Sequence, residues 1–351
     1  MRSRRAVVHR LPASGPDDVS GVETLFDGGL DPKSVVAVLG KTEGNGCVND
    51  FTRGFAARVF GDLFERRGAG EVAVVMSGGT EGALSPHWTV FAREDVDDAP
   101  TGALAVGIAR TADLPPEQLG RRGQIEMVAE GVGRAMADAG VTGAEDVHFV
   151  QVKCPLLTAA RVEDAARRGV TTATGDTLKS MGLSRGASAL GVAVALGEVD
   201  VDHIDDEDVC SGFDMFSGRA SASAGVELDG HEIIVLGMSE AWSGPLTIDH
   251  AVMRDAIDVA SVREARERMG DGALVAALAK AEADPSGQVR GRRHVMLDDS
   301  DISSTRHARA FVGGALAGLF GETEIYVSGG AEHQGPPGGG PVAIILDRSR
   351  S

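Results

Sequence analysis

Residues 34–41, SVVAVLGK, begin the pattern that decides the fold. Their β-branched run is typical of a buried strand, and this strand ends in a glycine and a lysine. A helical pattern then opens on Thr52-Arg53, and a second strand-like run, EVAVVM at 71–76, ends in Ser77-Gly78-Gly79. We interpret these residues as one unit: a strand ending in lysine, a helix opened by arginine, and a strand ending in serine and small residues.

Two further copies of this unit follow along the chain, in the same order and with different spacings. Their repeated residues are Lys153, Arg185 and Ser221, then Lys280, Arg306 and Ser328. A single lysine after a strand is usually a solvated surface residue, and a single Ser-Gly-Gly is usually a turn. Neither explanation accounts for lysine, arginine and serine occurring together three times, so the pattern indicates an internal repeat.

The repeat divides the chain into three units, residues 1–97, 102–241 and 246–351. The acidic stretch 93–101, which contains a proline, and the turn at 242–245 mark the boundaries. Alternating strands and helices predict an α/β fold. Open-ended solenoids have shorter repeats of ~20–50 residues, so we expect three structurally similar repeats around a pseudo-three-fold axis. The repeated lysines, arginines and serines would then face that axis.

Helical periodicity, with apolar residues at i, i+3 and i+4, marks five segments. They are residues 52–66, 122–139, 188–196, 253–269 and 305–319. Each lies between strand-like runs, as an α/β fold requires.

Composition and charge exclude several classes of protein. Lys and Arg number 34 against 52 Asp and Glu, a net charge of −18, whereas a nucleic-acid binder needs a clustered basic face. Hydrophobic residues make up 42%, enough for a sizeable core, but no apolar stretch approaches the ~18–20 residues of a membrane helix. Three cysteines are too few for a disulfide framework, and no signal-peptide core follows Met1. We therefore expect a soluble cytoplasmic protein without nucleic-acid or membrane partners.

A lysine buried at a strand end beside a serine can support nucleophilic chemistry. Burial disfavours the charged ammonium and lowers the lysine pKa, so the neutral amine can accept the serine proton. Backbone N–H groups after the serine can hold a developing oxyanion, and an arginine at the start of a helix offers donors to carbonyl oxygens. This combination suits acyl transfer at an amide or imide carbonyl, for which Ser–Lys pairs are a known variant of the catalytic triad.

Other motifs give weaker signals. Gly40-Lys41-Thr42 resembles the end of a P-loop, but the position five residues before Gly40, where that motif requires glycine, holds Val35. The histidines form no H-x-H or H-E-x-x-H motif, so no catalytic zinc centre is indicated. The loop 331–340, AEHQGPPGGG, could direct backbone carbonyls at a hard cation together with Glu282, or it could be an ordinary turn.

Seven segments carry a resemblance to a known family. They are GKTEGNGCVNDFTR (40–53), SGGTEGALSPH (77–87), QVKCPLL (151–157), SRGASALGVAVALGE (184–198), RASASAGVEL (219–228), RGRRHVMLDDSDI (290–302) and VSGGAEHQGPPGGGP (327–341). In these segments, which span nearly the whole chain, the sequence resembles the ring-opening amidohydrolases, the family of cyanuric acid hydrolase and barbiturase. The resemblance implies a three-repeat fold in which the strands form an inner β-barrel and the helices lie outside.

The resemblance also implies roles for the repeated residues. Lys153 and Ser221 would be the catalytic base and the nucleophile. Ser223 is a weaker rival to Ser221, because the second unit has Ser-Ala-Ser where the others have Ser-Gly-Gly. The remaining two pairs would bind and polarise the ring of the substrate: Lys41–Ser77 and Lys280–Ser328.

Arginines would hold the ring carbonyls of the substrate. The resemblance assigns this role to Arg53 and Arg185. For the third arginine, Arg306 fits the repeated context, but Arg309 lies one helical turn further on, and the sequence leaves both open. Small residues beside the serines complete the expected substrate contacts: Gly78, Ala222 and Gly329.

The family carries a structural divalent cation, and the resemblance implies that this chain binds Mg²⁺ or Ca²⁺ and uses no catalytic cofactor. The expected ligands are one side chain and groups of the loop after Ser328: Glu282, then Ala331, Gln334, Gly335, Pro336 and Gly339. The resemblance further implies a homotetramer.

The activity that the resemblance implies is hydrolytic opening of cyanuric acid, whose three carbonyls around a three-fold axis would match three Lys–Arg–Ser sets. The product, carboxybiuret, can lose CO2 to give biuret. One alternative is barbiturase chemistry, which opens barbiturate to ureidomalonate. Another is a non-catalytic binder of cyclic imides, which the three intact sets disfavour.

Overall fold

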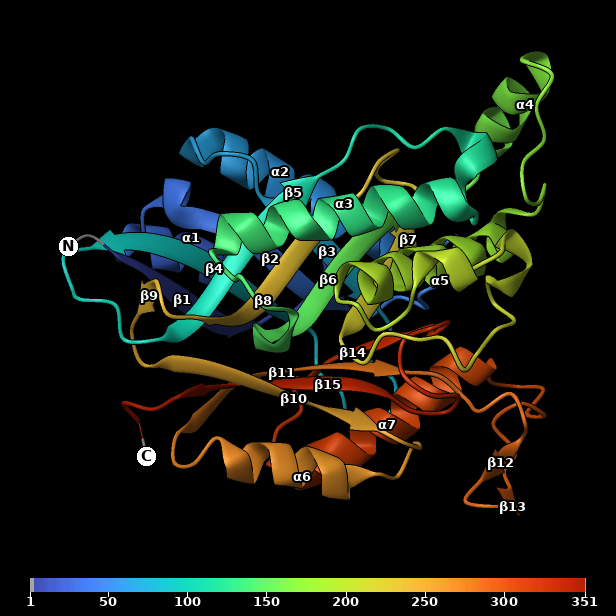
Figure 1. Ribbon diagram of the computed structural model, residues 1–351. Helices are drawn as coiled ribbons and strands as arrows, with labels where there is room; N and C mark the ends of the chain where they lie inside the picture. Colours follow the sequence, from blue (N-terminus) through green and yellow to red (C-terminus); the bar gives the residue numbers. More distant parts are fainter. Residues whose placement is uncertain (1–2, 351) are drawn as a thin grey trace.

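Three β-sheets with the same strand order form the framework of the protein (Figure 1). The computed structural model describes residues 3–350. The first sheet has the order β3-β2-β4-β1-β9. Its strands are β1 (Ser3–Pro12), β2 (Val35–Thr42), β3 (Ala73–Gly78), β4 (His87–Val96) and the two-residue β9 (Trp242–Ser243).

The second and third sheets repeat this arrangement, with the orders β5-β8-β6-β7 and β10-β15-β11-β14. The second sheet contains β5 (Ala103–Arg110), β6 (Val147–Pro155), β7 (Ala220–Gly225) and β8 (Glu232–Ser239). The third contains β10 (Leu246–Met253), β11 (Ala273–Ala281), β14 (Tyr326–Gly329) and β15 (Gly340–Asp347). In every sheet the second of these strands runs parallel to the third, and the other pairs between the four are antiparallel.

Helices follow the first and the second strand of each sheet, as right-handed crossovers between strands would require. They are α1 (Ser20–Asp27), α2 (Phe51–Arg67), α3 (Arg122–Ala139), α4 (Ala159–Arg167), α5 (Thr177–Ala195), α6 (Val259–Arg268) and α7 (Ser304–Phe320). In Figure 1, α3 and α5 lie side by side over the second sheet, and α6 and α7 cover the third. A small hairpin, β12 (Gln288–Val289) with β13 (Arg292–Arg293), projects from the third sheet's side of the molecule.

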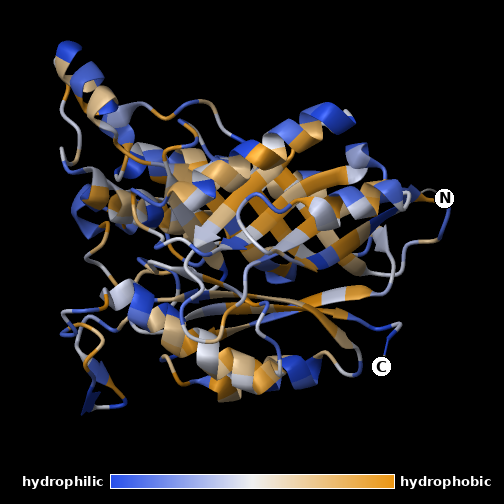
Figure 2. Cartoon of the chain, turned by 180° about the vertical axis from the view of Figure 1, so that it is seen from behind, coloured by the Kyte–Doolittle hydropathy of each residue, from blue (hydrophilic) through white to orange (hydrophobic). Residues whose placement is uncertain are grey.

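One apolar cluster takes buried side chains from all three sheets. Figure 2 shows this apolar interior as largely orange strands, next to helices in which orange and blue residues alternate. Because aromatic residues are only 4% of the chain, aliphatic side chains supply most of the packing. Members from the three sheets are Leu39 and Val75, Val152 and Ala222, and Leu278 and Tyr326. No helix within residues 3–350 is both long enough and apolar enough to span a membrane.

The named strands pair within their own sheets, so residues 3–350 form separate sheets and show no closed hydrogen-bonded barrel of the kind expected from the resemblance. Lysine side chains join neighbouring sheets instead. Lys41 Nζ in β2 donates to Val327 O in β14 at 2.5 Å, and Lys280 Nζ in β11 donates to Ala222 O in β7 at 2.5 Å. These hydrogen bonds run from inner strands, which are already paired on both edges, to the edge strand of another sheet.

Two helices have bounds that differ from those expected. Helix α5 begins at Thr177 rather than at residue 188, because the Asp176 side chain accepts a hydrogen bond from Lys179 N and caps the helix there. Helix α6 begins at Val259 rather than at residue 253, because residues up to Met253 pair with β15 as part of β10. Helices α1 and α4 are short and were not expected from the periodicity.

Candidate active site

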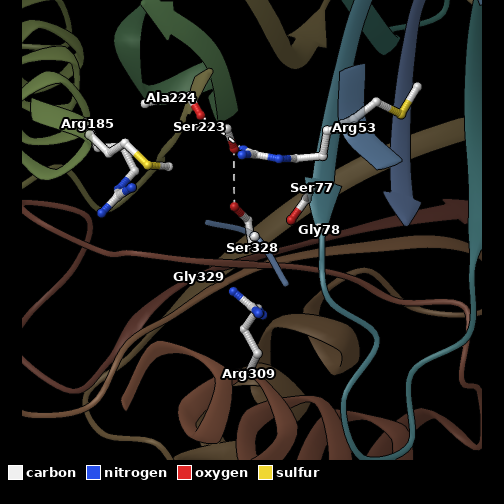
Figure 3. Close-up of a pocket in the computed structure, with 12 residues that line it drawn as sticks. Arg53, Ser77, Gly78, Arg185, Ser223, Ala224, Arg309, Ser328 and Gly329 are labelled. Carbon is white, nitrogen blue, oxygen red and sulfur yellow. Dashed lines mark hydrogen bonds between the residues drawn. The ribbon is translucent and has the colours of Figure 1, made fainter. Parts of the chain in front are cut away.

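A pocket opens where the parallel strand pairs of the three sheets end. In each pair the lysine of one strand lies opposite a serine of the other, because the carboxyl ends of parallel strands meet at the same edge. These pairs are Lys41–Ser77, Lys153–Ser223 and Lys280–Ser328. All three serines line the pocket (Figure 3). The hydroxyls of Ser223 and Ser328 are 3.2 Å apart, so serines of different sheets meet directly.

The serine opposite Lys153 is Ser223, and not Ser221 as the resemblance implied. Both serines lie on β7, and residues two apart on a strand point to the same face of the sheet. Ser221 lies one layer deeper, opposite Gln151, and its hydroxyl donates to Gln151 Oε1 at 2.8 Å. It is fully buried beneath the residues that line the pocket. The geometry therefore favours the rival that the sequence left as the weaker one.

The small residue beside the serine is likewise found two residues later on β7 than expected. Ala224, which follows Ser223, lines the pocket, whereas Ala222 does not. The Ala222 amide donates to Gln334 Oε1 at 2.7 Å, so it is engaged in holding the fold. The corresponding residues of the other sheets, Gly78 and Gly329, line the pocket as expected.

Three arginines surround the serines: Arg53, Arg185 and Arg309 (Figure 3). Arg53 lies in the first turn of α2, whose N-terminus the Asp50 side chain caps. Arg185 comes from the middle of α5 and not from its first turn. Arg309 reaches the pocket from the second turn of α7 with a side chain only 3% exposed, whereas Arg306 lies outside the pocket. The structure thus distinguishes the two candidates that the sequence left open.

Acidic residues that follow the serines hold two of these arginines, and each does so across a boundary between sheets. Glu81, from the loop after β3, binds Arg309 through both carboxylate oxygens at 3.1 and 2.6 Å. Glu332, from the loop after β14, binds Arg185 in the same way at 2.9 and 2.6 Å. Such bidentate pairs fix the plane of the guanidinium and therefore orient the arginine toward the pocket.

The second sheet departs from this pattern. Its corresponding acid, Glu227, contacts Lys153 Nζ at 3.4 Å instead of an arginine. Gly225 makes the contact possible, because a Cβ there would lie 1.7 Å from a Glu227 oxygen and 2.8 Å from Lys153 Nζ. Burial lowers the pKa of Lys153, and the charge of Glu227 opposes that effect. Burial also disfavours ionisation of Glu227, but attraction to Lys153 and Arg53, together with hydrogen bonds to the carboxylate, outweighs burial and lowers the Glu227 pKa.

The other two lysines have no such carboxylate contact among the described residues. Their amines donate to the backbone carbonyls of Val327 and Ala222. Lys41 Nζ also lies 3.4 Å from Ser77 Oγ, and Lys280 Nζ donates to Ser328 Oγ at 2.9 Å. Burial lowers the pKa of Lys41 far below its usual value. Burial and the charge of Arg185 lower the pKa of Lys280 to about 7.

Tyr326, the single tyrosine of the chain, is a pocket neighbour that sequence reasoning missed. It lies two residues before Ser328 on β14 and is fully buried in the layer beneath the serines. Burial raises the pKa of its phenol, against the opposing effect of the nearby Ser223 hydroxyl, so the phenol stays protonated. A single tyrosine forms no sequence motif, so its place beside the pocket can be recognised only from the structure.

A second cavity lies beside Glu282 and the loop after Ser328. Of the residues expected to hold a cation, those that line it are Glu282, Ala331, Gly335 and Pro336. The Glu282 carboxylate accepts hydrogen bonds from Thr305 Oγ1 at 2.8 Å and from Gly330 N at 3.1 Å. Burial raises the pKa of Glu282, and the like charge of Glu332 adds to this effect.

Two expected cation ligands are placed differently. The Gln334 side chain turns toward β7, where Oε1 accepts from Ala222 N, while Nε2 donates to Gly330 O at 3.1 Å. Gly339 N donates to Pro336 O at 2.9 Å and closes a turn of the loop. Neither residue lines the cavity. The Gln334 side chain and the Gly339 amide instead form hydrogen bonds within the loop and to the second sheet.

An α/β framework that gathers buried Lys–Ser pairs and arginines around one pocket defines an enzyme built for acyl transfer at amide carbonyls. Residues 7–347 match the model of the family described as amidohydrolase ring-opening protein. The chain therefore belongs to this family of ring-opening amidohydrolases.

Known proteins resemble the chain over its whole length. The cyanuric acid amidohydrolase of Rhizobium johnstonii is 68% identical over 351 residues, which cover 100% of both chains. That of Azorhizobium caulinodans is 61% identical over 352 residues, 98% of this chain and 99% of the relative. A crystal structure of the cyanuric acid hydrolase from A. caulinodans matches with a TM-score of 0.93 and 60% identity, covering 99% of each chain.

Proposed function

We propose that the protein opens the ring of cyanuric acid by hydrolysis. The observation that carries this proposal is the convergence of three serines and three arginines, one of each from every repeated unit, on one small pocket. Cyanuric acid carries three equivalent carbonyls, so each carbonyl can face one serine and one arginine. The full-length relatives named cyanuric acid amidohydrolase support the proposal.

This match requires the three units to surround a pseudo-three-fold axis that passes through the pocket. The common strand order of the three sheets supports such an axis. The units would be residues 1–97, 102–241 and 246–351, with their sheets innermost in a barrel-like arrangement and their helices outside. The axis would bring each Lys–Ser pair to the same depth, as the pairing of Lys41 with Ser77 and of Lys280 with Ser328 supports.

In the proposed mechanism Ser223 is the nucleophile and Lys153 is its base. The Ser223 oxygen attacks a ring carbonyl carbon, and its proton passes to Lys153 Nζ. Arginine donors and backbone N–H groups around the pocket stabilise the negative charge that develops on the carbonyl oxygen. Lys153 then gives the proton to the ring nitrogen as the C–N bond breaks, which leaves a carbamoyl-serine.

Water completes the reaction. A water molecule attacks the carbamoyl carbon, Lys153 accepts its proton, and the Ser223 oxygen leaves with a proton returned by Lys153. The product is carboxybiuret, which loses CO2 to give biuret. Water supplies the only atoms added to the ring, so the step needs no further reactant.

Glu227 supports the assignment of the catalytic base to the second unit. A base must be neutral at rest and must hold a proton after accepting it. Burial favours the neutral amine of Lys153, and the Glu227 carboxylate at 3.4 Å stabilises the ammonium once it forms. Lys41 and Lys280 donate to backbone carbonyls of neighbouring sheets, which leaves Lys153 as the one lysine of the three with a carboxylate partner among the described residues.

Turnover of cyanuric acid by the purified protein tests the proposal. We expect its ultraviolet absorbance to disappear and CO2 to be released, with barbiturate as the comparison substrate. Exclusive turnover of barbiturate would assign the barbiturase reaction instead. Tight binding of cyanuric acid without turnover would favour the non-catalytic binder.

Arg309 and Arg306 form a matched pair for testing the ring contacts. Arg309→Ala removes a guanidinium from the pocket, and we expect kcat/KM to fall by roughly 100-fold. Arg306→Ala alters a side chain outside the pocket and is expected to change kcat/KM by less than about twofold. Steady-state kinetics of both variants check the assignment, which an equal loss in the two would contradict.

We further propose that Mg²⁺ or Ca²⁺ binds in the cavity beside Glu282. The Glu282 carboxylate and the loop carbonyls around it are the hard oxygen ligands that these ions prefer. A cation there would also relieve the repulsion between the buried carboxylates of Glu282 and Glu332. When bound, it would stabilise the loop that follows Ser328.

Return of Mg²⁺ or Ca²⁺ to chelator-treated protein tests this cation proposal. Adding either ion is expected to raise the Tm of the wild-type protein by roughly 2–5 °C. Glu282→Gln is expected to remove the response to these two ions. A wild-type Tm that is the same with and without added Mg²⁺ and Ca²⁺ would contradict the proposal.

We also propose a homotetramer, which the family resemblance implies, and a cytoplasmic location, which the sequence predicts. Light scattering coupled to size-exclusion chromatography measures the mass of the assembly. A monomer with full activity would show that assembly is not needed for the proposed reaction.

A further inference from the structure

We propose that His148, Asp249 and His250 form a binding site for a divalent transition-metal ion such as Zn²⁺, which joins the second and third sheets. His148 lies at the start of β6, whereas Lys153 lies near the end of the same strand, so this cluster is at the opposite end of the sheet from the pocket. Asp249 and His250 lie on β10. No other group of three such ligands lies as close together within residues 3–350.

The three ligand atoms are spaced as a shared ion would require. His148 Nδ1 is 2.9 Å from His250 Nδ1 and 3.5 Å from Asp249 Oδ1, and His250 Nδ1 is 4.0 Å from Asp249 Oδ1. An ion bound tetrahedrally at ~2.0–2.2 Å from each ligand places the ligand atoms roughly 3.3 Å apart. The observed separations lie on both sides of this value, so small side-chain rotations would bring all three atoms onto one ion.

The backbone directs His148 toward this point. Its strand contains an irregularity between Val147 and Phe149, where the pairing with β8 shifts and His148 is the extra residue. The first and third sheets have the same irregularity, with Val36 and Val275 as the extra residues. A bulge re-aims the side chain that it carries. At this position the chain has a ligating side chain in the second sheet and valine in the other two.

Neighbouring contacts prepare the ligands. Arg268 Nε donates to Asp249 Oδ2 at 3.0 Å, and His250 N donates to Asp249 Oδ1 at 2.7 Å, so both bonds fix the carboxylate plane. Oδ1 is the oxygen nearer to the histidines, and its second lone pair can face the ion. The nearby charge of Arg219 is offset by Glu198, 3.8 Å away.

The donor set selects the kind of ion. Two imidazole nitrogens and one carboxylate oxygen suit Zn²⁺, Co²⁺ or Ni²⁺, whereas Mg²⁺ and Ca²⁺ prefer oxygen ligands alone. The three side chains are 15–19% exposed, so water can complete the coordination. Because the ligands come from β6 and β10, the ion would connect the two sheets and stabilise their junction. It would not touch the proposed substrate.

Metal titration of untagged, chelator-treated protein tests the proposal. With Zn²⁺ we expect one equivalent bound per chain and a Tm raised by at least about 2 °C, and with Co²⁺ the visible d–d bands of a nitrogen-containing site. His148→Val is the matched variant, because valine occupies both equivalent positions. It should fold, keep its turnover of cyanuric acid within about twofold, and lose the response to Zn²⁺ and Co²⁺. His250→Ala should lose it too.

Two controls separate this site from others. His203→Ala changes an exposed histidine far along the chain and should leave the response to Zn²⁺ intact. Glu282→Gln should also leave it intact, because that residue belongs to the oxygen-lined cavity. Absence of a Zn²⁺ response in the wild-type protein, or an undiminished response in both His148→Val and His250→Ala, would overturn the proposal. Neither result would bear on the ring-opening activity.

Discussion

Replacing Ser223 by alanine is expected to lower kcat for cyanuric acid by roughly 1,000-fold or more, because the proposed nucleophile is lost. The side chain lines the pocket on the strand position opposite Lys153, and alanine occupies the same backbone without strain. We therefore expect the Tm to change little. Stopped and continuous assays of purified Ser223→Ala measure the residual rate.

Ser221→Ala is the matched control, two residues away on the same strand. It removes the hydrogen bond to Gln151 Oε1 and leaves that buried acceptor unsatisfied, which costs about 1–3 kcal/mol of stability. It removes no group from the pocket, so kcat should fall by less than about tenfold. If Ser221→Ala were the inactive variant and Ser223→Ala the active one, the nucleophile would be Ser221 after all. Activity in both variants would instead direct attention to Ser328, whose hydroxyl Lys280 contacts at 2.9 Å.

Replacing Lys153 by methionine is expected to lower kcat by roughly 100- to 10,000-fold, the range of a lost general base. The side chain is buried, so an apolar residue of similar length should fit and keep the protein folded. The variant tests the base separately from the nucleophile. If Lys153→Met were inactive while Ser223→Ala were active, Lys153 would have a role in substrate binding and not as the base of Ser223. Near-normal turnover by Lys153→Met would contradict its role as base.

The pH dependence of kcat/KM gives a second test of Lys153. A lysine base works only when neutral, so activity should fall as pH falls through its pKa, and burial places that pKa below the usual value. Glu227 raises the pKa of Lys153 by attraction, so Glu227→Gln should move the acidic limb of the profile to lower pH. The same change should lower kcat, because the ammonium formed in the reaction loses its partner. A limb that moves to higher pH would contradict the pairing.

Much of the fold could be predicted from the sequence because its strands are rich in valine and its helices are periodic. Helix α3 has the bounds that its periodicity predicted, residues 122–139. The strand β7 is the exception. Its sequence, ASASAG, contains no β-branched or aromatic residue, so composition alone marks neither its ends nor its register. That missing register is the physical reason why Ser221, and not Ser223, was expected at the pocket.

The sequence does contain a pattern that identifies which serine of β7 corresponds to Ser77 and Ser328. Glutamate occupies the fourth position after the serine in the first and third units, at Glu81 and Glu332, and Glu227 stands in that position relative to Ser223 but not to Ser221. The choice between Arg306 and Arg309 had no such signal. It depends on how α7 packs against the third sheet, since both arginines lie in the first two turns of one helix. Tyr326 and the cluster around His148 likewise depend on contacts between distant segments.

Two carboxylate–arginine pairs join the three repeated units to one another. Glu81 from the first third holds Arg309 from the last, and Glu332 from the last holds Arg185 from the middle. A fragment that lacked any third would lose at least one of these pairs, together with one serine and one arginine of the pocket. Thermal unfolding should consequently be a single cooperative event, and no fragment that lacks a third of the chain can keep a complete pocket.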